Sequence, residues 1–295
     1  MTTSARLVRT VVLYFLGVLT TLLRIALLLP AIFSLLGSAL AQSDVDYSRL
    51  DRDDIYRRLR KVATGAAERR AVLKSLFEEA GCRDEKLTDQ PVEGGEAPNL
   101  VCTLQGDTAS QIIVGARYDA DAAKGGVIDN WTGAALLPSL YQSLYSRPRR
   151  HTIIFVALFS GGEKEHLGAR SYTRSLSKQE TKDIAAMVEL RGLGLTRTLA
   201  WQFGHDQVLA TLVRSVADSV MIPVDPIAPG KLGRVDAALF AKRGIPAIIL
   251  HSVSKYNHDI LQGPDDSLDA VKLNEYYETY LLTASYLAFL DFALD

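Results

Sequence analysis

Residues 151–172 read HTIIFVALFSGGEKEHLGARSY and divide into two halves. The first half is a nearly continuous apolar run, which is typical of a strand buried on both faces of a parallel sheet. The second half follows a pair of glycines and has the composition of a helix. The stretch therefore predicts a strand followed by a helix, the repeating unit of an α/β protein.

The same alternation of apolar runs and helical patterns continues on both sides of this stretch. Further strands are expected at NLVCTL (99–104), SQIIVGA (110–116), IAAMVEL (184–190), TLAWQF (198–203) and GIPAIIL (244–250). Helical patterns occur around 53–62 and 66–81, over 130–146, from 164 onward, and over 206–220 and 269–292. We therefore predict a three-layer α/β/α sandwich around a mostly parallel mixed sheet. In such folds, ligands bind beyond the carboxyl ends of the strands.

The overall composition fits one large α/β domain. Of the 295 residues, 48% are hydrophobic and 23% are charged, which is enough to form a sizeable core. The 33 basic and 34 acidic residues give a formal net charge of −1. Because this balance indicates no extended basic surface, we do not expect the protein to bind nucleic acid.

The first 41 residues differ from the rest of the chain. Residues 11–41 hold a single charged residue, Arg24, between two apolar stretches. A membrane-spanning helix with Arg24 near its centre would carry a cost of roughly 2.5–3.5 kcal/mol. The second stretch ends in Ala39-Leu40-Ala41, a small-residue pattern that signal peptidases cut. We predict that residues 1–41 are a signal peptide, cleaved after Ala41, or a retained membrane anchor, and that residues 42–295 form the folded domain.

Both interpretations of the leader place the domain outside the cytoplasm. We expect a periplasmic or secreted protein, or one anchored in the inner membrane, whose N-terminal segment contacts the membrane at least during export. Cys82 and Cys102 are compatible with such a compartment, since an even pair can close a disulfide there. They could equally remain two buried free thiols, and two thiols are too few for a zinc cluster.

Polar residues follow the predicted strands directly and mark a candidate site. They are Arg117, Tyr118 and Asp119 after 110–116, Gly162 and Glu163 after 151–159, Arg191 after 184–190, and the pair Asp129-Asn130 at the start of the next helix. Taken singly, each has a structural explanation; Asp129, for example, could cap a helix. Taken together, they gather charged side chains at one edge of the expected sheet.

Six segments in order resemble the zinc-dependent exopeptidases of the bacterial leucyl aminopeptidase type, a family that also includes glutaminyl cyclases. They are IIVGARYDAD, GGVIDNWTGAALL, FVALFSGGEKEHLGARSY, MVELRGLG, VDAALFAKRGIPAIIL and QGPDDSLD. The resemblance covers about residues 53–293, so that 42–295 is expected to be an exopeptidase-like domain. It implies the zinc exopeptidase fold, also described as phosphorylase/hydrolase-like.

The resemblance also implies where a pair of catalytic zinc ions would be bound, and several of those positions have changed. The family has His-Tyr-Asp where this chain has Arg117-Tyr118-Asp119, so that a zinc-binding His is replaced. Asp129 matches the bridging carboxylate and Glu163 matches another ligand. Gly162 occupies the position of the glutamate that acts as general base.

Two further ligand positions differ from the family pattern. Arg191 stands where the family has a zinc-binding Asp, and Gln262 stands where it has the last His ligand. Asp236 resembles an Asp that lies near the substrate amine, although a helix cap would explain it equally well. The expected remnant pocket consists of Arg117, Asp119, Asp129, Glu163, Arg191, Asp236 and Gln262.

The changes at the five zinc-ligand positions conserve charge. Two zinc ions, three carboxylates and a hydroxide sum to zero, and so do two arginines and two carboxylates beside the neutral Gln262. Arginine stays protonated and cannot ligate zinc, but its planar fork pairs well with carboxylates. We therefore predict that arginine–carboxylate pairs replace the metals, with no bound metal, no cofactor and no working catalytic residue.

Three functional interpretations follow from these residues. We favour a catalytically inactive pseudopeptidase with a binding or scaffold role toward an unknown peptide or protein partner. The alternative is an active metallo-aminopeptidase with a rearranged zinc site, in which Glu163 and His166 share a metal at one-turn helical spacing. A glutaminyl cyclase would need one zinc ligated at Asp129, Glu163 and Gln262 with a base at Gly162, and that set keeps only two ligands and no base.

Overall fold

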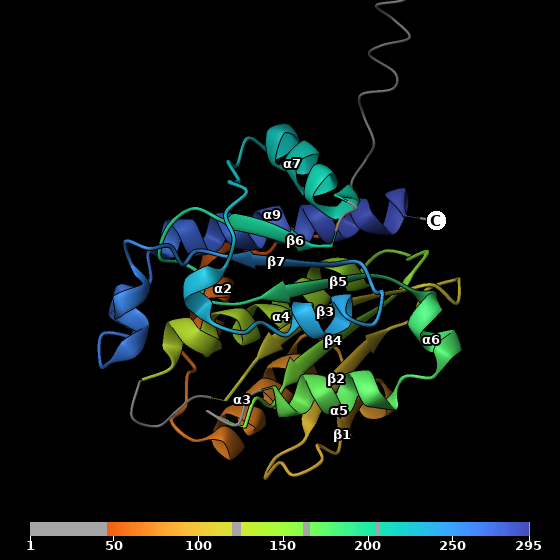
Figure 1. Cartoon of the computed structure of the whole chain (residues 1–295), viewed down its shortest axis with the longest axis horizontal. Helices are drawn as coiled ribbons and strands as arrows, with labels where there is room; N and C mark the ends of the chain where they lie inside the picture. The colour runs from red at the N-terminus through yellow and green to blue at the C-terminus, as the bar shows by residue number, and fades with distance from the viewer. Residues whose placement is uncertain (1–45, 120–124, 162–165, 205–206, 295) are drawn as a thin grey trace, which may run out of the picture. The chain divides into compact units, whose positions relative to one another are not determined.

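A seven-stranded mixed sheet runs through the part of the chain that the computed structural model describes, residues 46–119, 125–161, 166–204 and 207–294 (Figure 1). The strands are β1 (Leu87–Gln90), β2 (Asn99–Leu104), β3 (Gln111–Arg117), β4 (Thr152–Leu158), β5 (Ile184–Leu190), β6 (Leu199–Phe203) and β7 (Ala247–His251). Their order is β1-β2-β4-β3-β5-β7-β6. The central strands β4, β3, β5 and β7 pair in parallel, whereas β2 and β6 are antiparallel to their neighbours. The expected mostly parallel mixed sheet is therefore confirmed.

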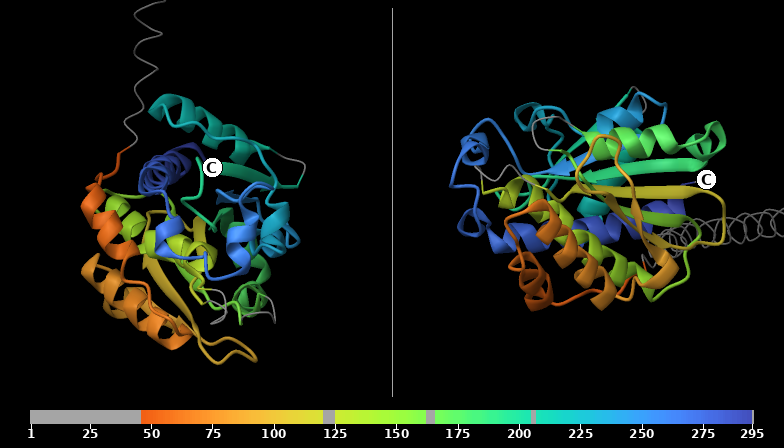
Figure 2. Two further views of the ribbon diagram at one scale, coloured as in Figure 1. Left: turned by 90° about the vertical axis from the view of Figure 1, so that its left-hand side faces the viewer. Right: turned by 90° about the horizontal axis from the view of Figure 1, so that it is seen from below.

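Helices cover both faces of this sheet. They are α2 (Arg52–Leu59), α3 (Ala66–Glu79), α4 (Thr132–Tyr145), α5 (Leu167–Ser175), α6 (Lys178–Asp183), α7 (Val208–Val220), α8 (Ala237–Ala241) and α9 (Leu273–Ala293). α2, α3, α4 and α9 pack together on one face, while α5 and α8 pack together on the other. The right-hand view of Figure 2 shows the sheet between these two helical layers. This is the predicted three-layer α/β/α arrangement.

The layer of α5 and α8 is held by apolar packing against the sheet. Tyr172 of α5 and Phe240 of α8 lie 5.9 Å apart between ring centroids. They belong to one buried cluster with Ile113 of β3 and Met187 of β5. Because α8 is only one turn long, its position depends on this packing. The same packing therefore positions Asp236, which directly precedes α8.

The close approach of α4 to β5 depends on Gly133. A Cβ at this position would lie 2.2 Å from the carbonyl oxygen of Leu190, so a larger residue would push α4 away from the sheet. Thr132, next to it, accepts a 3.0 Å hydrogen bond from the backbone N–H of Leu193. These contacts fix the segment before α4 against the segment after β5, where the candidate site residues lie.

Several element boundaries differ from the prediction. The helix expected from 164 begins as α5 at Leu167, behind His166 in left-handed backbone with φ 63°. A single π-helical turn, η3 (Val127–Trp131), precedes α4. The edge strand β1 was not predicted, because its sequence LTDQ carries no apolar run. Short 3₁₀ turns complete the chain at η1 (Asp84–Lys86), η5 (Gly230–Leu232), η6 (His258–Gln262) and η7 (Leu268–Ala270).

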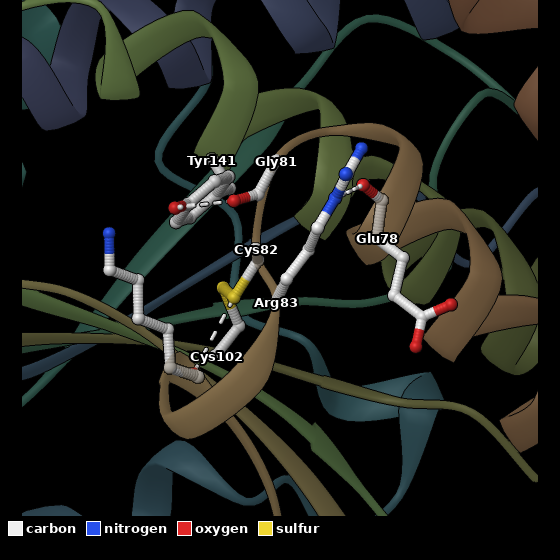
Figure 3. The surroundings of a disulfide bond; sticks show 7 residues. Glu78, Gly81, Cys82, Arg83, Cys102 and Tyr141 are labelled. Atoms are coloured by element: carbon white, nitrogen blue, oxygen red, sulfur yellow. Dashed lines mark hydrogen bonds between the residues drawn. A yellow bond between two sulfur atoms is a disulfide. The ribbon is translucent and has the colours of Figure 1, made fainter.

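Cys82 and Cys102 form a disulfide, so the alternative of two free thiols is wrong (Figure 3). The Cα atoms are 6.3 Å apart, and both side chains are fully buried. The bond links the segment after α3 to β2. No described helix is long and apolar enough to cross a membrane. The predicted signal peptide or anchor lies outside the described residues.

Candidate functional site

The candidate site lies where strands β3 and β5 end. Arg117 is the last residue of β3, and Arg191 directly follows β5. Asp129 lies in the π-helical turn before α4, at a point where the backbone is not helical (φ −116°, ψ 88°). Asp236 directly precedes α8. Segments distant in sequence therefore meet at the carboxyl edge of the sheet, as expected for a ligand site in this architecture.

Arg117 and Asp236 form a buried, forked ion pair. Nε of Arg117 lies 2.8 Å from one carboxylate oxygen, and Nη2 lies 3.1 Å from the other. Arg117 is 7% exposed and Asp236 is 1% exposed. Nδ1 of His166 lies 2.5 Å from the same carboxylate. Burial alone would raise the pKa of Asp236, but the charge of Arg117 and the hydrogen bonds from His166 and Arg117 hold that pKa well below its usual range.

Arg191 and Asp129 form a second forked pair. Nε and Nη2 of Arg191 lie 2.6 and 2.8 Å from the two oxygens of Asp129. Burial opposes ionisation of Asp129, but the charge and hydrogen bonds of Arg191 outweigh it and lower the pKa. The sequence predicts that the two arginines pair with carboxylates but not which residues pair, and the structure pairs Arg191 with Asp129. Arg117, by contrast, pairs with Asp236 and not with Asp129.

One carbonyl group connects the two pairs. The backbone oxygen of Arg234 accepts a 2.8 Å hydrogen bond from Nη1 of Arg191 and a 3.2 Å hydrogen bond from Nη2 of Arg117. Both guanidinium groups are therefore held on their acidic partners and on a shared acceptor. We call Arg117, Arg191, Asp129 and Asp236 with this carbonyl the arginine–carboxylate network.

The interpretation of Asp236 as a helix cap is wrong. Asp236 does precede α8, but its side chain makes no capping hydrogen bond. Both carboxylate oxygens face the network instead. The sequence could not separate the two possibilities, because an Asp before a short helix suits either.

Asp119 holds the turn that follows β4 in place. Its carboxylate accepts hydrogen bonds from the backbone N–H and the hydroxyl of Ser160, at 2.7 and 2.8 Å, and from the N–H of Gly161 at 2.9 Å. Asp119 is 3% exposed, so these bonds satisfy a buried acid. It acts as a structural support for the turn after β4.

The loop that carries Asp129 is held by two residues that sequence reasoning missed. Arg69 of α3 is 1% exposed and donates to the carbonyl oxygens of Gly126 (2.7 Å), Gly125 (3.0 Å) and Tyr118 (3.4 Å). The carboxylate of Asp266 accepts hydrogen bonds from the backbone N–H groups of Ile128 and Asp129. Burial raises the pKa of Asp266 to about 6.

Glu189 is a further buried acid beside the network. It lies within β5 and is fully buried. One oxygen accepts a 2.7 Å hydrogen bond from the N–H of Ala237, and the other has no hydrogen-bond partner among the described residues. Burial and then the charge of Asp236 raise the pKa of Glu189 to about 7. A glutamate within an otherwise apolar strand was the signal that could have found it.

We expect Glu189 to make stability fall as pH rises from about 5 to about 7. Its ordinary pKa of 4.5 is raised in the folded state, so the folded protein keeps a proton that the unfolded chain has released. Because a tenfold difference in proton affinity corresponds to about 1.4 kcal/mol, the loss amounts to about 3 kcal/mol. The lowered pKa values of Asp129 and Asp236 change the stability only at more acidic pH, where these carboxylates become protonated.

Denaturant unfolding at pH 5 and pH 8 measures this effect. The Glu189→Gln variant should lose the part of the pH dependence that Glu189 contributes, keep the part that comes from the raised pKa of Asp266, and be more stable than the native protein at pH 8. Equal pH dependence in both proteins would contradict the assignment.

Three predicted site positions remain untested by the structure. Gly162, Glu163 and the side chain of Gln262 lie outside the part that it describes. The hypothesis that Glu163 and His166 share a metal is not tested either, because Glu163 lies outside the described residues. His166 itself directs Nδ1 to Asp236.

The residues that the structure describes do not fit a paired-zinc centre. Within that part of the chain, no three His, Cys, Asp or Glu side chains are arranged so that they could hold a metal ion. Asp129 and Asp236, the acids of the arginine–carboxylate network, each accept two hydrogen bonds from a guanidinium group. A guanidinium remains charged and offers no lone pair to a metal. The network therefore presents donors where zinc would need acceptors.

Residues 99–287, more than half of the chain, match the sequence profile of Peptidase family M28. The chain belongs to peptidase family M28. A search of curated proteins gave no match. This M28 chain is similar in fold to the LapA aminopeptidase of Legionella pneumophila, with a TM-score of 0.68 and 20% identity over 83% of this chain and 72% of LapA.

Other structures share the M28 fold. A glutaminyl cyclase from an Acidobacteriales bacterium gives a TM-score of 0.67 and 15% identity over 85% of this chain and 98% of its own. The zinc aminopeptidase BSAP from Bacillus subtilis gives a TM-score of 0.59 and 18% identity over 68% of this chain. This M28 chain covers only half the length of BSAP. At these identities the likeness shows the fold alone.

Proposed function

We propose that this protein is a catalytically inactive member of the M28 family with a binding role. The observation that carries the proposal is the arginine–carboxylate network, in which Arg117 and Arg191 stand at positions that the family resemblance assigns to zinc ligands. Each arginine is fixed by a forked pair and by the carbonyl of Arg234. A guanidinium group does not lose its proton and cannot ligate a metal, so each arginine puts a permanent cation at a position where the family would bind zinc.

Loss of the metal would remove two parts of the family's chemistry. A zinc ion supplies a Lewis acid for the peptide carbonyl and a bound water of low pKa. The general base would also be missing, because Gly162 occupies its position in the resemblance. Base catalysis of this kind contributes on the order of 10²–10⁴-fold to rate. A rearranged active zinc site receives less support, since His166 is engaged with Asp236.

We propose further that the domain is exported. The Ala39-Leu40-Ala41 pattern in the leader supports this, and the Cys82–Cys102 disulfide is typical of oxidising compartments. N-terminal sequencing of the protein recovered from its native host tests the proposal. A start at Gln42 or a membrane-bound full chain is expected, and a soluble cytoplasmic full chain would contradict it.

Catalytic inactivity is tested with chromogenic aminoacyl anilides and dipeptides. The protein, purified without chelator and assayed with added Zn²⁺ or Co²⁺, should release product no faster than a sample without protein. A zinc aminopeptidase of the family, assayed in parallel, verifies the conditions. Turnover that a chelator abolishes would overturn the proposal.

A further inference from the structure

A pocket of about 580 Å³ opens beside the arginine–carboxylate network. It lies between the start of α5, strand β6, the loop before α8 and α8 itself. His166, which contacts Asp236 of the network, forms one of its walls. Its size falls in the range of sites for small organic ligands, about 300–1,000 Å³.

The charged residues that line the pocket are all cationic. They are Arg170, Arg234 and Lys242, and no Asp or Glu occurs among the described lining residues. The side chains of Arg170 and Lys242 make no hydrogen bond or ion pair within the described part of the chain. Elsewhere on this protein, described arginines commonly pair with carboxylates, as Arg174 does with Glu93 and Arg70 with Asp89. The pocket therefore holds two cations, Arg170 and Lys242, that no described wall residue neutralises.

The remaining walls are apolar and aromatic. Trp201 and Phe203 line the pocket from β6, and Val235 and Leu239 line it from the segment around α8. Trp201 is 39% exposed, although large aromatic side chains are usually well buried. The exposed indole of Trp201, near Arg170 and Lys242, offers a surface for stacking next to a site for an anion.

From this arrangement we propose that the pocket binds an organic carboxylate joined to an aromatic or branched aliphatic group. The guanidinium of Arg170 and the ammonium of Lys242 would bind the carboxylate, and Trp201 and Phe203 would contact the apolar group. Such a ligand is either a free carboxylic acid or the C-terminal residue of a peptide. The inference rests on the binding role proposed above and names its ligand.

Tryptophan fluorescence provides a direct reporter of binding. The chain has two tryptophans, of which Trp131 is fully buried and Trp201 lines the pocket. We would titrate the full protein with N-acetylphenylalanine, with a short peptide ending in phenylalanine, and with the same peptide carrying a C-terminal amide. Both free carboxylates should give a saturable change in emission that is absent from Trp201→Phe, and calorimetry on that variant checks that it still folds and binds.

Charge-reversal variants test the cations. Arg170→Glu and Lys242→Glu should each weaken binding of the free carboxylates by about tenfold or more, because a forked or charged hydrogen bond is replaced by repulsion. Arg214→Glu is the matched control, since Arg214 is an exposed arginine of α7 outside the pocket. It should leave affinity unchanged.

The outcomes separate the sources of the ligand and the possible failures. Tighter binding of the peptide than of N-acetylphenylalanine supports a peptide C-terminus, and equal binding supports a free acid. The inference would be overturned if neither N-acetylphenylalanine nor the free-acid peptide gave a saturable change in emission. It would also be overturned if the amidated peptide bound with the same affinity as the free acid, or if Arg214→Glu weakened binding as much as the pocket variants do. Such a failure leaves catalytic inactivity standing, because that is measured separately by turnover.

Discussion

Replacing Arg117 with leucine is expected to lower the free energy of unfolding by about 3–5 kcal/mol. The substitution leaves the carboxylate of Asp236 in a place where it is 1% exposed, with no cation forked onto it. An uncompensated buried charge costs more than the ion pair itself contributes, which is why removal of one partner has so large an effect. Chemical denaturation at pH 7 measures the change.

Two further variants make this prediction specific. In the double variant Arg117→Leu with Asp236→Leu the acid that lost its cation is removed as well, so a large part of the lost stability should return. Arg174→Leu breaks the exposed pair with Glu93, in which the side chains are 68% and 79% exposed, and should cost less than about 1 kcal/mol. Similar losses for Arg117→Leu and Arg174→Leu would show that the network is not a buried charge pair.

Replacing Arg69 with leucine is expected to cost on the order of 4 kcal/mol. Leucine fills part of the space but leaves the carbonyl oxygens of Ala63, Tyr118 and Gly125 without the donor that Arg69 supplies. An unsatisfied buried acceptor costs about 1–3 kcal/mol. The oxygens of Tyr118 and Gly125 belong to the segment between β3 and Asp129, so the loss also loosens the position of Asp129. Thermal or denaturant unfolding measures the loss.

The neighbouring arginine supplies a matched control for Arg69. Arg70 lies one residue further along α3 and pairs with Asp89 at the surface. Arg70→Leu should cost less than about 1 kcal/mol, because exposed pairs contribute little. If both variants lost the same stability, the burial of Arg69 under the loop would not have the role assigned to it.

The fold was largely predictable because its signal is distributed along the chain. Each central strand is a continuous apolar run, and a run of that kind is compatible with few positions other than a buried sheet. Strand β1 escaped prediction because it lies at the sheet edge, where LTDQ needs no apolar side chains. Element ends shifted by a few residues, since caps and single turns depend on tertiary contacts.

The candidate site was predictable only in part. A pairing between arginines and acids could be expected, because the family resemblance placed them at one site and buried acids need cations. The partner of each arginine could not be predicted, and Asp236, which pairs with Arg117, was not among the acids placed at the zinc-ligand positions. Arg69 was missed because ERRAVLK resembles a solvated helix face. Its spacing from Leu73 and Leu76, at i+4 and i+7, was the signal that it faces inward.

The buried acids Glu189 and Asp266 show a different limit. Their burial arises from the packing of α8 against β5 and of the loop at 263–267 against the turn η3, which no local pattern encodes. Their raised pKa values are consequences of that packing. Sequence reasoning can nominate residues for a site, but it cannot say which of them lose contact with water.

The zinc content of the native protein tests the central claim most directly. Protein purified without chelator and then dialysed against micromolar Zn²⁺ would be analysed by inductively coupled plasma mass spectrometry. We predict no stoichiometric zinc, because Arg191 holds Asp129, the bridging carboxylate of the resemblance, and Arg117 stands at another ligand position. One or two zinc ions bound to each chain, removed by chelation together with any dipeptide turnover, would contradict this account.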